Sequence, residues 1–279
     1  MPELPEVETI ARSLNNILPG RIFQGVTIRY SGCLKSGSDF FQSGIANQEI
    51  KKVWRRGKLV LINLNKQYHI VFHLKMSGQL LYGVGTEPSF DKHTHLIFRL
   101  NDQGFLYFHD TRKFGYCYLL SSDELDQWPY FASLGPEPLG LEAEEFVSIF
   151  RKSRARIKSV LLDQSKISGI GNIYADEALH ESGIHPATPC CRIDQDSLKA
   201  LSSCLQRVLH RSIKAGGTTL RDYMDSLGNS GAYQNDFMAY GRKGLPCKTC
   251  STSLESCKVA GRTTVYCPKC QPLLNSNDQ

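Results

Sequence analysis

Residues 247–270 read CKTCSTSLESCKVAGRTTVYCPKC, a stretch that begins and ends with a C-x-x-C pair. The pairs are Cys247 with Cys250 and Cys267 with Cys270, and sixteen residues separate them. Two such pairs at this spacing are typical of a tetrahedral zinc site. Because four thiolates fill the coordination sphere, we expect one structural Zn²⁺, held in a C-terminal zinc-finger β-hairpin, that takes no part in catalysis.

The segment between the two cysteine pairs carries Arg262, within Gly261-Arg262-Thr263-Thr264. The tip of the expected hairpin falls here, and an arginine at such a tip is well placed to bind a phosphate. A solvated loop arginine is the alternative, and this segment alone does not choose between the two.

The charge of the chain favours a polyanionic partner. Its 279 residues, long enough for two domains, include 33 Lys+Arg and 27 Asp+Glu, a net charge of +6. The basic residues gather at Lys51-Lys52 with Arg55-Arg56-Gly57-Lys58, at Arg112-Lys113, at Arg151-Lys152-Ser153-Arg154 with Arg156 and Lys158, and at Arg242-Lys243. These clusters favour nucleic acid. No apolar run of about 18 residues and no signal pattern is present, so we expect a cytoplasmic protein.

A second phosphate site is predicted where Gly169-Ile-Gly171-Asn172 leads into a helix expected at residues 172–181. The backbone N–H groups of a helix N-terminus point outward and favour an anion. The alternative is a tight turn between helices without a ligand, because a Gly-x-Gly is weak by itself. Helical periodicity extends across residues 142–227, so this part of the chain reads as a helical domain.

The N-terminal half reads as a β-sandwich or barrel with a flanking helix. Residues 5–18 show helical periodicity that Pro19-Gly20 ends. Strands are expected at residues 22–30, 49–55, 58–64, 69–76, 95–100, 105–109 and 116–120. This many strands without intervening helices suggests sheet-on-sheet packing. The Pro/Gly-rich residues 134–140 mark a domain boundary.

The first residues, Met1-Pro2-Glu3-Leu4-Pro5-Glu6, allow two interpretations. Prolines near a terminus often only start a helix. If Met1 is removed, however, Pro2 presents a secondary amine whose pKa of roughly 7.7–8.0 leaves part of it unprotonated near neutrality. Such an amine can form a Schiff base, with Glu3 as a proton donor or acceptor and Glu6 on the same side of the helical turn.

Several loop residues also admit a functional role. Met76 and Phe114 stand at loop ends, where they either end strands inside the core or form a wedge in a base stack, with Arg112 filling the hydrogen bonds of a displaced base. Lys58 could contact phosphate or act as an acid. His93 and His95 lack an evident third metal ligand, so we expect phosphate-contacting or buried histidines.

Taken together, these motifs resemble bacterial formamidopyrimidine-DNA glycosylase. The resemblance rests on MPELPEVET (1–9), KMSG (75–78), DTRKFG (110–115), LGPEPL (134–139), GIGNIYADE (169–177), GGTTL (216–220), YGRKG (240–244) and the four cysteines. It implies a multidomain α+β protein: a β-sandwich with flanking helices, a helix–two-turn–helix domain and a zinc finger. We place the domains at 1–130, 148–235 and 236–271, with a linker at 131–147 and a flexible tail at 272–279.

The resemblance also implies a bifunctional enzyme of base-excision repair that excises 8-oxoguanine and formamidopyrimidines and then cleaves the abasic site. Pro2 matches the Schiff-base nucleophile, Glu3 the acid that protonates sugar or base, and Glu6 a second carboxylate that orients the terminus. Lys58 matches the lysine of β-elimination, and Arg262 the phosphate-binding arginine of δ-elimination. DNA contacts are implied at His93, Arg112, Arg154, Lys158 and Asn172, and filling of the void at Met76, Arg112 and Phe114. Ser153 is the alternative to Arg154 in that alignment.

The implied partner is double-stranded DNA with oxidised purines or abasic sites, bound by a monomer in the bacterial cytoplasm, near the nucleoid. Three other functions compete with this one. An endonuclease VIII-like enzyme shares the fold and Pro2 but prefers oxidised pyrimidines. A zinc protein that binds DNA without catalysis does not explain Pro2, Glu3 and Lys58 together, and a tautomerase with an N-terminal proline has no use for the zinc ribbon.

Overall fold

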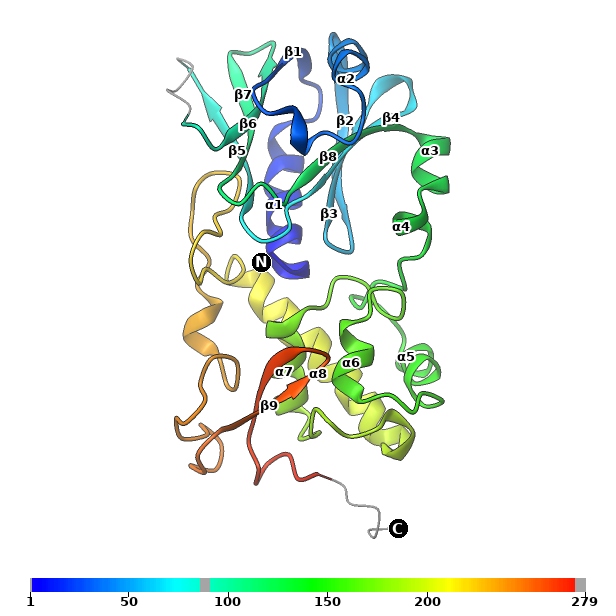
Figure 1. Cartoon of the computed structure of the whole chain (residues 1–279), viewed down its shortest axis with the longest axis vertical. Coiled ribbons are helices and arrows are strands. Elements are labelled where there is room, and N and C mark those ends of the chain that lie inside the picture. Colours follow the sequence, from blue (N-terminus) through cyan, green and yellow to red (C-terminus); the bar gives the residue numbers. More distant parts are fainter. Residues whose placement is uncertain (1, 86–90, 274–279) are drawn as a thin grey trace. The chain divides into compact units, whose positions relative to one another are not determined.

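The computed structural model describes residues 2–85 and 91–273 (Figure 1). By their internal contacts the residues form two compact units. The first unit comprises Met1–Ala132 and Ile213–Ala232, and the second comprises Ser133–Ser212 and Tyr233–Gln279. Across the described residues, no helix combines the length and the apolar character that crossing a membrane requires.

An antiparallel sheet forms the body of the first unit. Its strands are β1 (Ile22–Ile28), β2 (Gln48–Arg56), β3 (Leu59–Leu64), β4 (Tyr68–His73), β5 (Gly78–Val84), β6 (Thr94–Leu100), β7 (Gly104–Asp110) and β8 (Tyr116–Ser121). They lie in the order β5-β7-β6-β1-β2-β3-β4-β8. Only two residue pairs register β1 with β2, Ile22 with Glu49 and Phe23 with Gln48. The sheet therefore has two halves joined by a short ladder.

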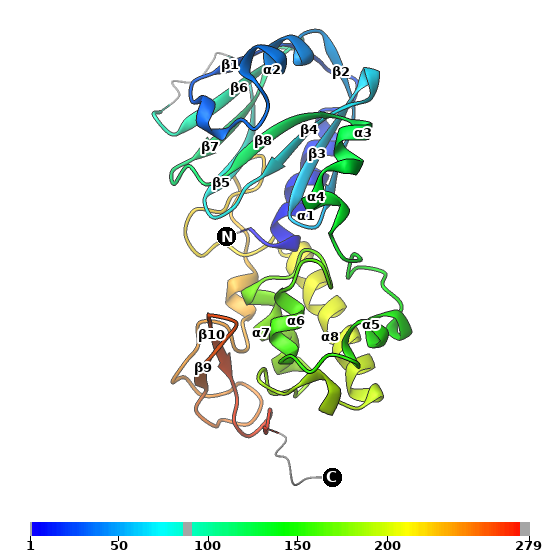
Figure 2. The same ribbon diagram turned by 45° about the vertical axis from the view of Figure 1, so that its right-hand side comes forward.

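The two halves of this sheet pack against each other, as Figure 2 shows. Phe72 of β4 lies 6.0 Å from Phe98 of β6 and 5.6 Å from Phe108 of β7, measured between ring centroids. All three rings are fully buried. Aromatic side chains bury large areas and dominate such cores, so these rings hold the two halves face to face. The predicted β-sandwich is confirmed.

In the described part of the first unit, the α-helices beside this sandwich are α1 (Leu4–Ile17), α2 (Ser38–Ile45), α3 (Ser122–Gln127) and α4 (Pro129–Ala132). Helix α1 packs on β2 and β3. Its side chains Val7, Ile10 and Leu14 recur at helical spacing and are fully buried, which anchors the first residues of the chain. The helix ends before Gly20, whose φ of +85° favours glycine.

The second unit is helical and ends in a β-hairpin. Its α-helices are α5 (Ala143–Phe150), α6 (Ile157–Leu162), α7 (Asn172–Glu181) and most of α8 (Gln195–Lys214). The hairpin pairs β9 (Glu255–Val259) with β10 (Arg262–Tyr266). Ala260 and Gly261 connect the strands, both with positive φ (48° and 71°), as a tight two-residue turn requires. Arg262 is the first residue after this turn, at the predicted tip.

Several elements differ from the sequence-based expectations. Strand β5 and helices α2, α3 and α4 were not predicted. Residues 213–232, which we placed in the helical domain, belong to the first unit by their internal contacts. The reason is specific bonding: Tyr82 of β5 donates its backbone N–H to the carbonyl of Ser226, and the Ser226 hydroxyl donates to the carbonyl of Ile10.

Candidate active site and nucleic-acid interface

The N-terminus is held by a reciprocal pair of carboxylates. Glu3 caps helix α1 and accepts from the backbone N–H of Glu6, while Glu6 Oε2 accepts from the N–H of Glu3 at 2.8 Å. Such a capping box satisfies two helix-end donors at once. Pro5 lies in the first turn of the helix, so Pro2 precedes the helix rather than starting it. Glu3 and Glu6 are 3% and 2% exposed, which fixes the residues beside Pro2.

Glu6 also binds a distant loop, residues 216–223. Its Oε1 accepts from the backbone N–H of Thr218 at 2.8 Å. The hydroxyl of Tyr223 lies 3.4 Å from the Glu6 carbonyl oxygen and 3.0 Å from that of Gly216. Burial holds the pKa of Tyr223 above its usual range, so this hydroxyl is a neutral donor. The 216–223 loop and the N-terminus therefore share one carboxylate.

A glycine makes this contact possible. Gly217 has a φ of +84°, and a Cβ there would come within 3.1 Å of Glu6 Cγ, Glu6 Oε1 and a ring carbon of Tyr223. Glycine is therefore needed at the second position of the GGTTL motif, because the backbone there approaches Glu6 closely in a left-handed conformation. Sequence reasoning missed the link between the loop and Glu6, and only the two adjacent glycines hinted at a close approach.

Lys58 lies in the tight turn between β2 and β3, where Gly57 has a φ of +55°. The lysine is 7% exposed. Close to it, His73 ends β4 and accepts the backbone N–H of Lys75 through Nδ1 at 3.0 Å. Burial, followed by the positive charges of Lys75 and Lys58, lowers the pKa of His73 to about 3. An uncharged imidazole thus lies beside the lysine at neutral pH.

Met76, Arg112 and Phe114 come together from two loops. Arg112 Nη1 lies 3.1 Å from the sulfur of Met76, and its guanidinium carbon lies 4.9 Å from the centroid of the Phe114 ring. Met76 and Phe114 are 43% and 53% exposed, so the alternative that they end strands inside the core is wrong. A contiguous exposed group with two apolar members is the kind of surface that inserts into a base stack.

Buried Asp110 joins these two loops. Its Oδ1 accepts from the Ser77 hydroxyl and from the backbone N–H of Arg112, and its Oδ2 accepts from the N–H of Gly115 at 2.7 Å. A carboxylate that takes several such donors at full burial fixes the backbone around it. His95, 1% exposed, donates through Nε2 to the Asp110 carbonyl at 2.8 Å. His95 is thus the buried histidine of the two that we considered.

His93, the other histidine, is half-buried. Its backbone N–H donates to Asp91 Oδ1 at 2.9 Å, and its ring centroid lies 5.8 Å from that of His109. His109 Nε2 lies 3.2 Å from Asp91 Oδ2. His93 and His95 do not form a metal site with a third ligand: within residues 2–85 and 91–273, the only group with the geometry of a metal site is the four cysteines.

Asn172 is the first residue of α7, after the N-cap Gly171. Its Nδ2 donates to the carbonyl of Thr263 in β10 at 3.1 Å, so the helix N-terminus and the hairpin meet at this residue. Gln164 stabilises the preceding turn, where it accepts from the Gly169 N–H and donates to the Ile170 carbonyl. Arg154 is exposed on the loop before α6.

Lys158 behaves differently from its basic neighbours. It is fully buried, and its ammonium donates to Asp176 Oδ1 at 2.5 Å and to Thr264 Oγ1 at 2.7 Å. A direct contact with DNA would require this arrangement to open, so the contact implied by the resemblance stays a prediction. The sequence carried no sign of the burial, because the covering strand is 106 residues away.

The sulfur atoms of Cys247, Cys250, Cys267 and Cys270 all lie within 4.8 Å of one another. Backbone N–H groups of Thr249 and Cys270 donate to Cys247 Sγ and Cys267 Sγ at 3.4 Å, which favours the thiolate form. Four convergent thiolates fit a closed zinc site.

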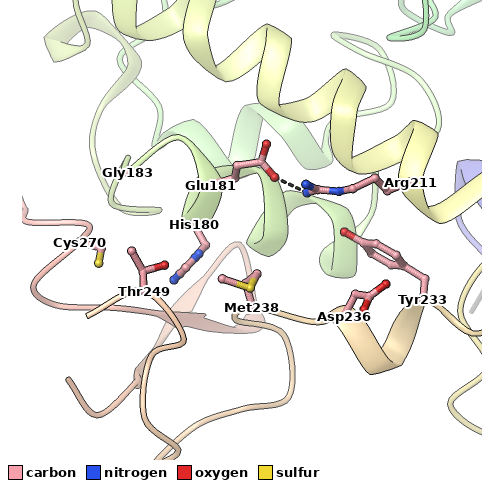
Figure 3. Close-up of a pocket in the computed structure, with 9 residues that line it drawn as sticks. All are labelled: His180, Glu181, Gly183, Arg211, Tyr233, Asp236, Met238, Thr249 and Cys270. Atoms are coloured by element: carbon pink, nitrogen blue, oxygen red, sulfur yellow. Dashed lines mark hydrogen bonds and ion pairs between the residues drawn. The ribbon is translucent and has the colours of Figure 1, made fainter. Parts of the chain in front are cut away.

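Beside the cysteines lies a cavity of about 550 Å³ (Figure 3). His180, which points toward Thr249 in this view, has its Nε2 3.4 Å from Cys247 Sγ. Across the cavity, Glu181 is paired with Arg211. Both charged groups are thus engaged with each other, and we assign no ligand to this cavity.

Three protein-family models match successive parts of the chain. The model of the formamidopyrimidine-DNA glycosylase N-terminal domain matches residues 1–117, and that of the H2TH domain of the same enzyme matches residues 134–224. The model of the zinc finger found in FPG and IleRS matches residues 244–273. The chain belongs to the formamidopyrimidine-DNA glycosylase family. The match of the zinc-finger model, together with the clustered sulfurs, establishes one structural zinc.

Curated members of the formamidopyrimidine-DNA glycosylase family match along their whole length. The relative from Pelotomaculum thermopropionicum is 42% identical over 274 residues, which cover 97% of this chain and 99% of the relative. That from Bacillus subtilis is 39% identical over 279 residues, with 97% and 99% coverage. The resemblance stated from the motifs is therefore confirmed.

Solved structures of formamidopyrimidine-DNA glycosylases agree in fold. The Lactococcus lactis enzyme in complex with DNA containing an abasic site has a TM-score of 0.89 and 34% identity, and the match covers 97% of this chain and 99% of that one. A point mutant of the same enzyme, in complex with DNA containing Fapy-dG, also has a TM-score of 0.89 and 34% identity, with 97% and 100% coverage.

Proposed function

We propose that this chain is a bifunctional DNA glycosylase and abasic-site lyase that excises oxidised purines, chiefly 8-oxoguanine and formamidopyrimidines. Membership of the formamidopyrimidine-DNA glycosylase family supports glycosylase action in the repair of oxidised DNA. The observation that carries the proposed lyase chemistry is the structure of the N-terminus, where Pro2 precedes α1 and the Glu3–Glu6 capping box fixes the residues beside it.

In the proposed reaction, Met1 has been removed and the nitrogen of Pro2 is a free amine. The nitrogen attacks C1′ of the lesion sugar, the bond from C1′ to the base breaks, and the base leaves with that electron pair and takes a proton. The amine then loses its proton, the sugar ring opens with Glu3 protonating its oxygen, and an iminium remains. Glu6 orients the terminus through Glu3.

The iminium makes the C2′ hydrogen acidic, and its removal breaks the C3′–O bond and releases one phosphate. A second elimination removes a C4′ proton, breaks the C5′–O bond and releases the other phosphate. We assign Lys58 to the first elimination and Arg262 to the second. The zinc-bound cysteines hold the hairpin that carries Arg262, and zinc supplies structure only.

DNA binding is proposed to depend mainly on phosphate contacts, so affinity should fall with salt. His93, Arg154, Asn172 and Arg262 are the proposed phosphate contacts. The exposed group Met76, Arg112 and Phe114 is proposed to fill the space left when the lesion nucleotide leaves the stack. The partner is double-stranded DNA bound by a monomer.

Borohydride trapping on DNA with a single 8-oxoguanine tests the nucleophile. We expect a covalent adduct with the wild type, and its loss in Pro2→Gly. Pro5→Ala is the matched control, since it changes a proline of the same segment that only occupies the helix start. Mass spectrometry should find Met1 absent from the active protein. No adduct with the wild type would refute the lyase proposal.

The alternative lesion class is oxidised pyrimidine. One structural neighbour, the Lactococcus lactis enzyme, was solved with DNA containing an oxidised pyrimidine. Base release from 8-oxoguanine:C duplexes should therefore be compared directly with release from thymine glycol duplexes. Faster release of thymine glycol would overturn the purine assignment and favour an endonuclease VIII-like specificity.

A further inference from the structure

The buried pair of Lys158 on α6 and Asp176 on α7 has no role in the reaction described above. The exposed fractions of the two side chains are 0% and 1%. Removing two charges from water is costly, and hydrophobic residues of similar size often stabilise a core better. A buried ion pair is therefore weak evidence for stability, and its best-attested use is to fix one arrangement of the elements that it joins.

The pair bonds to one strand at successive residues. Lys158 donates to the hydroxyl of Thr264, and Asp176 Oδ2 accepts the backbone N–H of Val265 at 3.2 Å. The preceding residue, Thr263, accepts from Asn172 through its carbonyl. Three consecutive residues of β10 are thus held by groups of α6 and α7, which sets the position of the strand along its own axis.

Arg262 is the first residue of β10 and directly precedes Thr263. It is exposed, and the tight turn at Ala260-Gly261 limits the freedom of its backbone from the other side. Because the chain is fixed at Thr263, Thr264 and Val265, the Cα of Arg262 has little freedom to shift. Displacement of a reacting group by about 1 Å can cost a hundredfold in rate, so this restraint matters for any chemistry at Arg262.

We propose that Lys158 and Asp176 are positioning residues that lock the zinc-finger hairpin onto α6 and α7, so that Arg262 and Asn172 meet the same stretch of DNA backbone. The inference rests on the proposed role of Arg262 in the second elimination. The resemblance implies a DNA contact for Lys158, and this inference replaces that contact: Lys158 acts from the interior, through Asp176 and Thr264, and touches no phosphate itself. Loss of the pair should therefore impair the second elimination selectively, and leave base release and the first elimination largely intact.

The test uses the zinc-loaded full chain and a 5′-labelled duplex with a single abasic site. The first elimination leaves a sugar remnant on the labelled fragment and the second leaves a 3′-phosphate, and the two products separate by electrophoresis. Lys158→Met should lower the ratio of 3′-phosphate to sugar-remnant product by about tenfold. Lys166→Met, which removes an exposed lysine of the same unit, should leave the ratio unchanged.

Two further variants control for misfolding of Lys158→Met. K158M/D176L removes both charges, so that no unpaired carboxylate stays buried, and Thr264→Val removes only the hydroxyl that accepts from Lys158. Both should shift the product ratio in the same direction, with the smaller effect in Thr264→Val. Each variant is compared at one zinc per chain, so that loss of metal is not mistaken for loss of position.

A double-variant cycle with Arg262→Ala separates positioning from a general effect. If Lys158 acts through Arg262, Lys158→Met changes the ratio in the wild-type background and adds nothing when Arg262 is absent. An unchanged ratio in the folded variants overturns the inference, and so does an equal loss of base release and both eliminations. Failure of the proposed function looks different, because the wild type itself would then give no trapped adduct and no 3′-phosphate product.

Discussion

Gly217→Ala tests whether close contact with Glu6 holds the N-terminus in place. The new Cβ would meet Glu6 Cγ, Glu6 Oε1 and the Tyr223 ring at 3.1 Å, in a backbone with a φ of +84°. Gly20→Ala is a matched control in the same unit, because Gly20 has a φ of +85° and no atom within 4 Å of the added Cβ. The two variants share the backbone strain and differ only in the contact.

The shared strain of a left-handed alanine is about 1–2 kcal/mol. In Gly217→Ala the Glu6 carboxylate must also move away from the N–H of Thr218, which it now accepts at 2.8 Å. A hydrogen bond to a charged group contributes about 1.5–3 kcal/mol, and a buried N–H left without an acceptor costs a similar amount. We therefore expect Gly217→Ala to lower the free energy of unfolding by about 1.5–3 kcal/mol more than Gly20→Ala.

Urea unfolding measures the difference in the free energy of unfolding between the two variants. Borohydride trapping measures their rates of Schiff-base formation. Because Glu6 Oε2 accepts the N–H of Glu3, a displaced Glu6 should also slow Schiff-base formation in Gly217→Ala, whereas Gly20→Ala should trap at the wild-type rate. Hydrogen exchange at the Thr218 amide should be faster in Gly217→Ala alone. Equal destabilisation of the two variants, with equal trapping, would refute the coupling of the loop to the terminus.

Three other predictions follow from the geometry. The pKa of His73 is lowered to about 3, so below pH 6.5 the unfolded chain binds a proton there and the folded chain does not. The free energy of unfolding should therefore fall by about 2 kcal/mol from pH 7 to pH 5, and urea unfolding of His73→Asn should show a smaller fall. Met76→Ala and Phe114→Ala change exposed side chains, so the free energy of unfolding should change by no more than about 0.5 kcal/mol, as in the control Val84→Ala. Affinity for lesion DNA, measured in a binding titration, should fall in the first two variants only. A large loss of stability would place Met76 and Phe114 in the core. Removal of zinc by a chelator should abolish formation of 3′-phosphate ends, and added Zn²⁺ should restore it; full activity of the metal-free protein would contradict a structural role.

Features with a local signature were predictable from the sequence. The spacing of Cys247, Cys250, Cys267 and Cys270 predicted a cluster that the structure contains. The periodicity of α1, and the glycines before α7, predicted both helices to within a residue or two. In each case the information lies within one turn or one loop of the chain, where spacing decides the outcome.

Strand β5 could not be predicted because its sequence, GQLLYGV, contains two glycines and lacks a clear alternation. It lies at the edge of the sheet, where pairing with β7 determines its conformation. Tertiary contacts also decide the position of two charged residues. Glu6 bonds to Thr218 across 212 residues, and Lys158 bonds to Thr264 across 106. No local pattern distinguishes Lys158 from the exposed basic residues before it.

The first unit is built from two segments, and this has a consequence for synthesis of the protein. Residues 133–212 belong to the second unit and are translated before Ile213–Ala232, which complete the first. A nascent chain that ends before residue 213 carries Pro2 but lacks Thr218, the donor that fixes Glu6. Domains generally fold as they emerge from the ribosome. Here Glu6, whose other oxygen accepts from the N–H of Glu3, gains its bond to Thr218 only after residue 218 has been added, so an incomplete product carries Pro2 without this support.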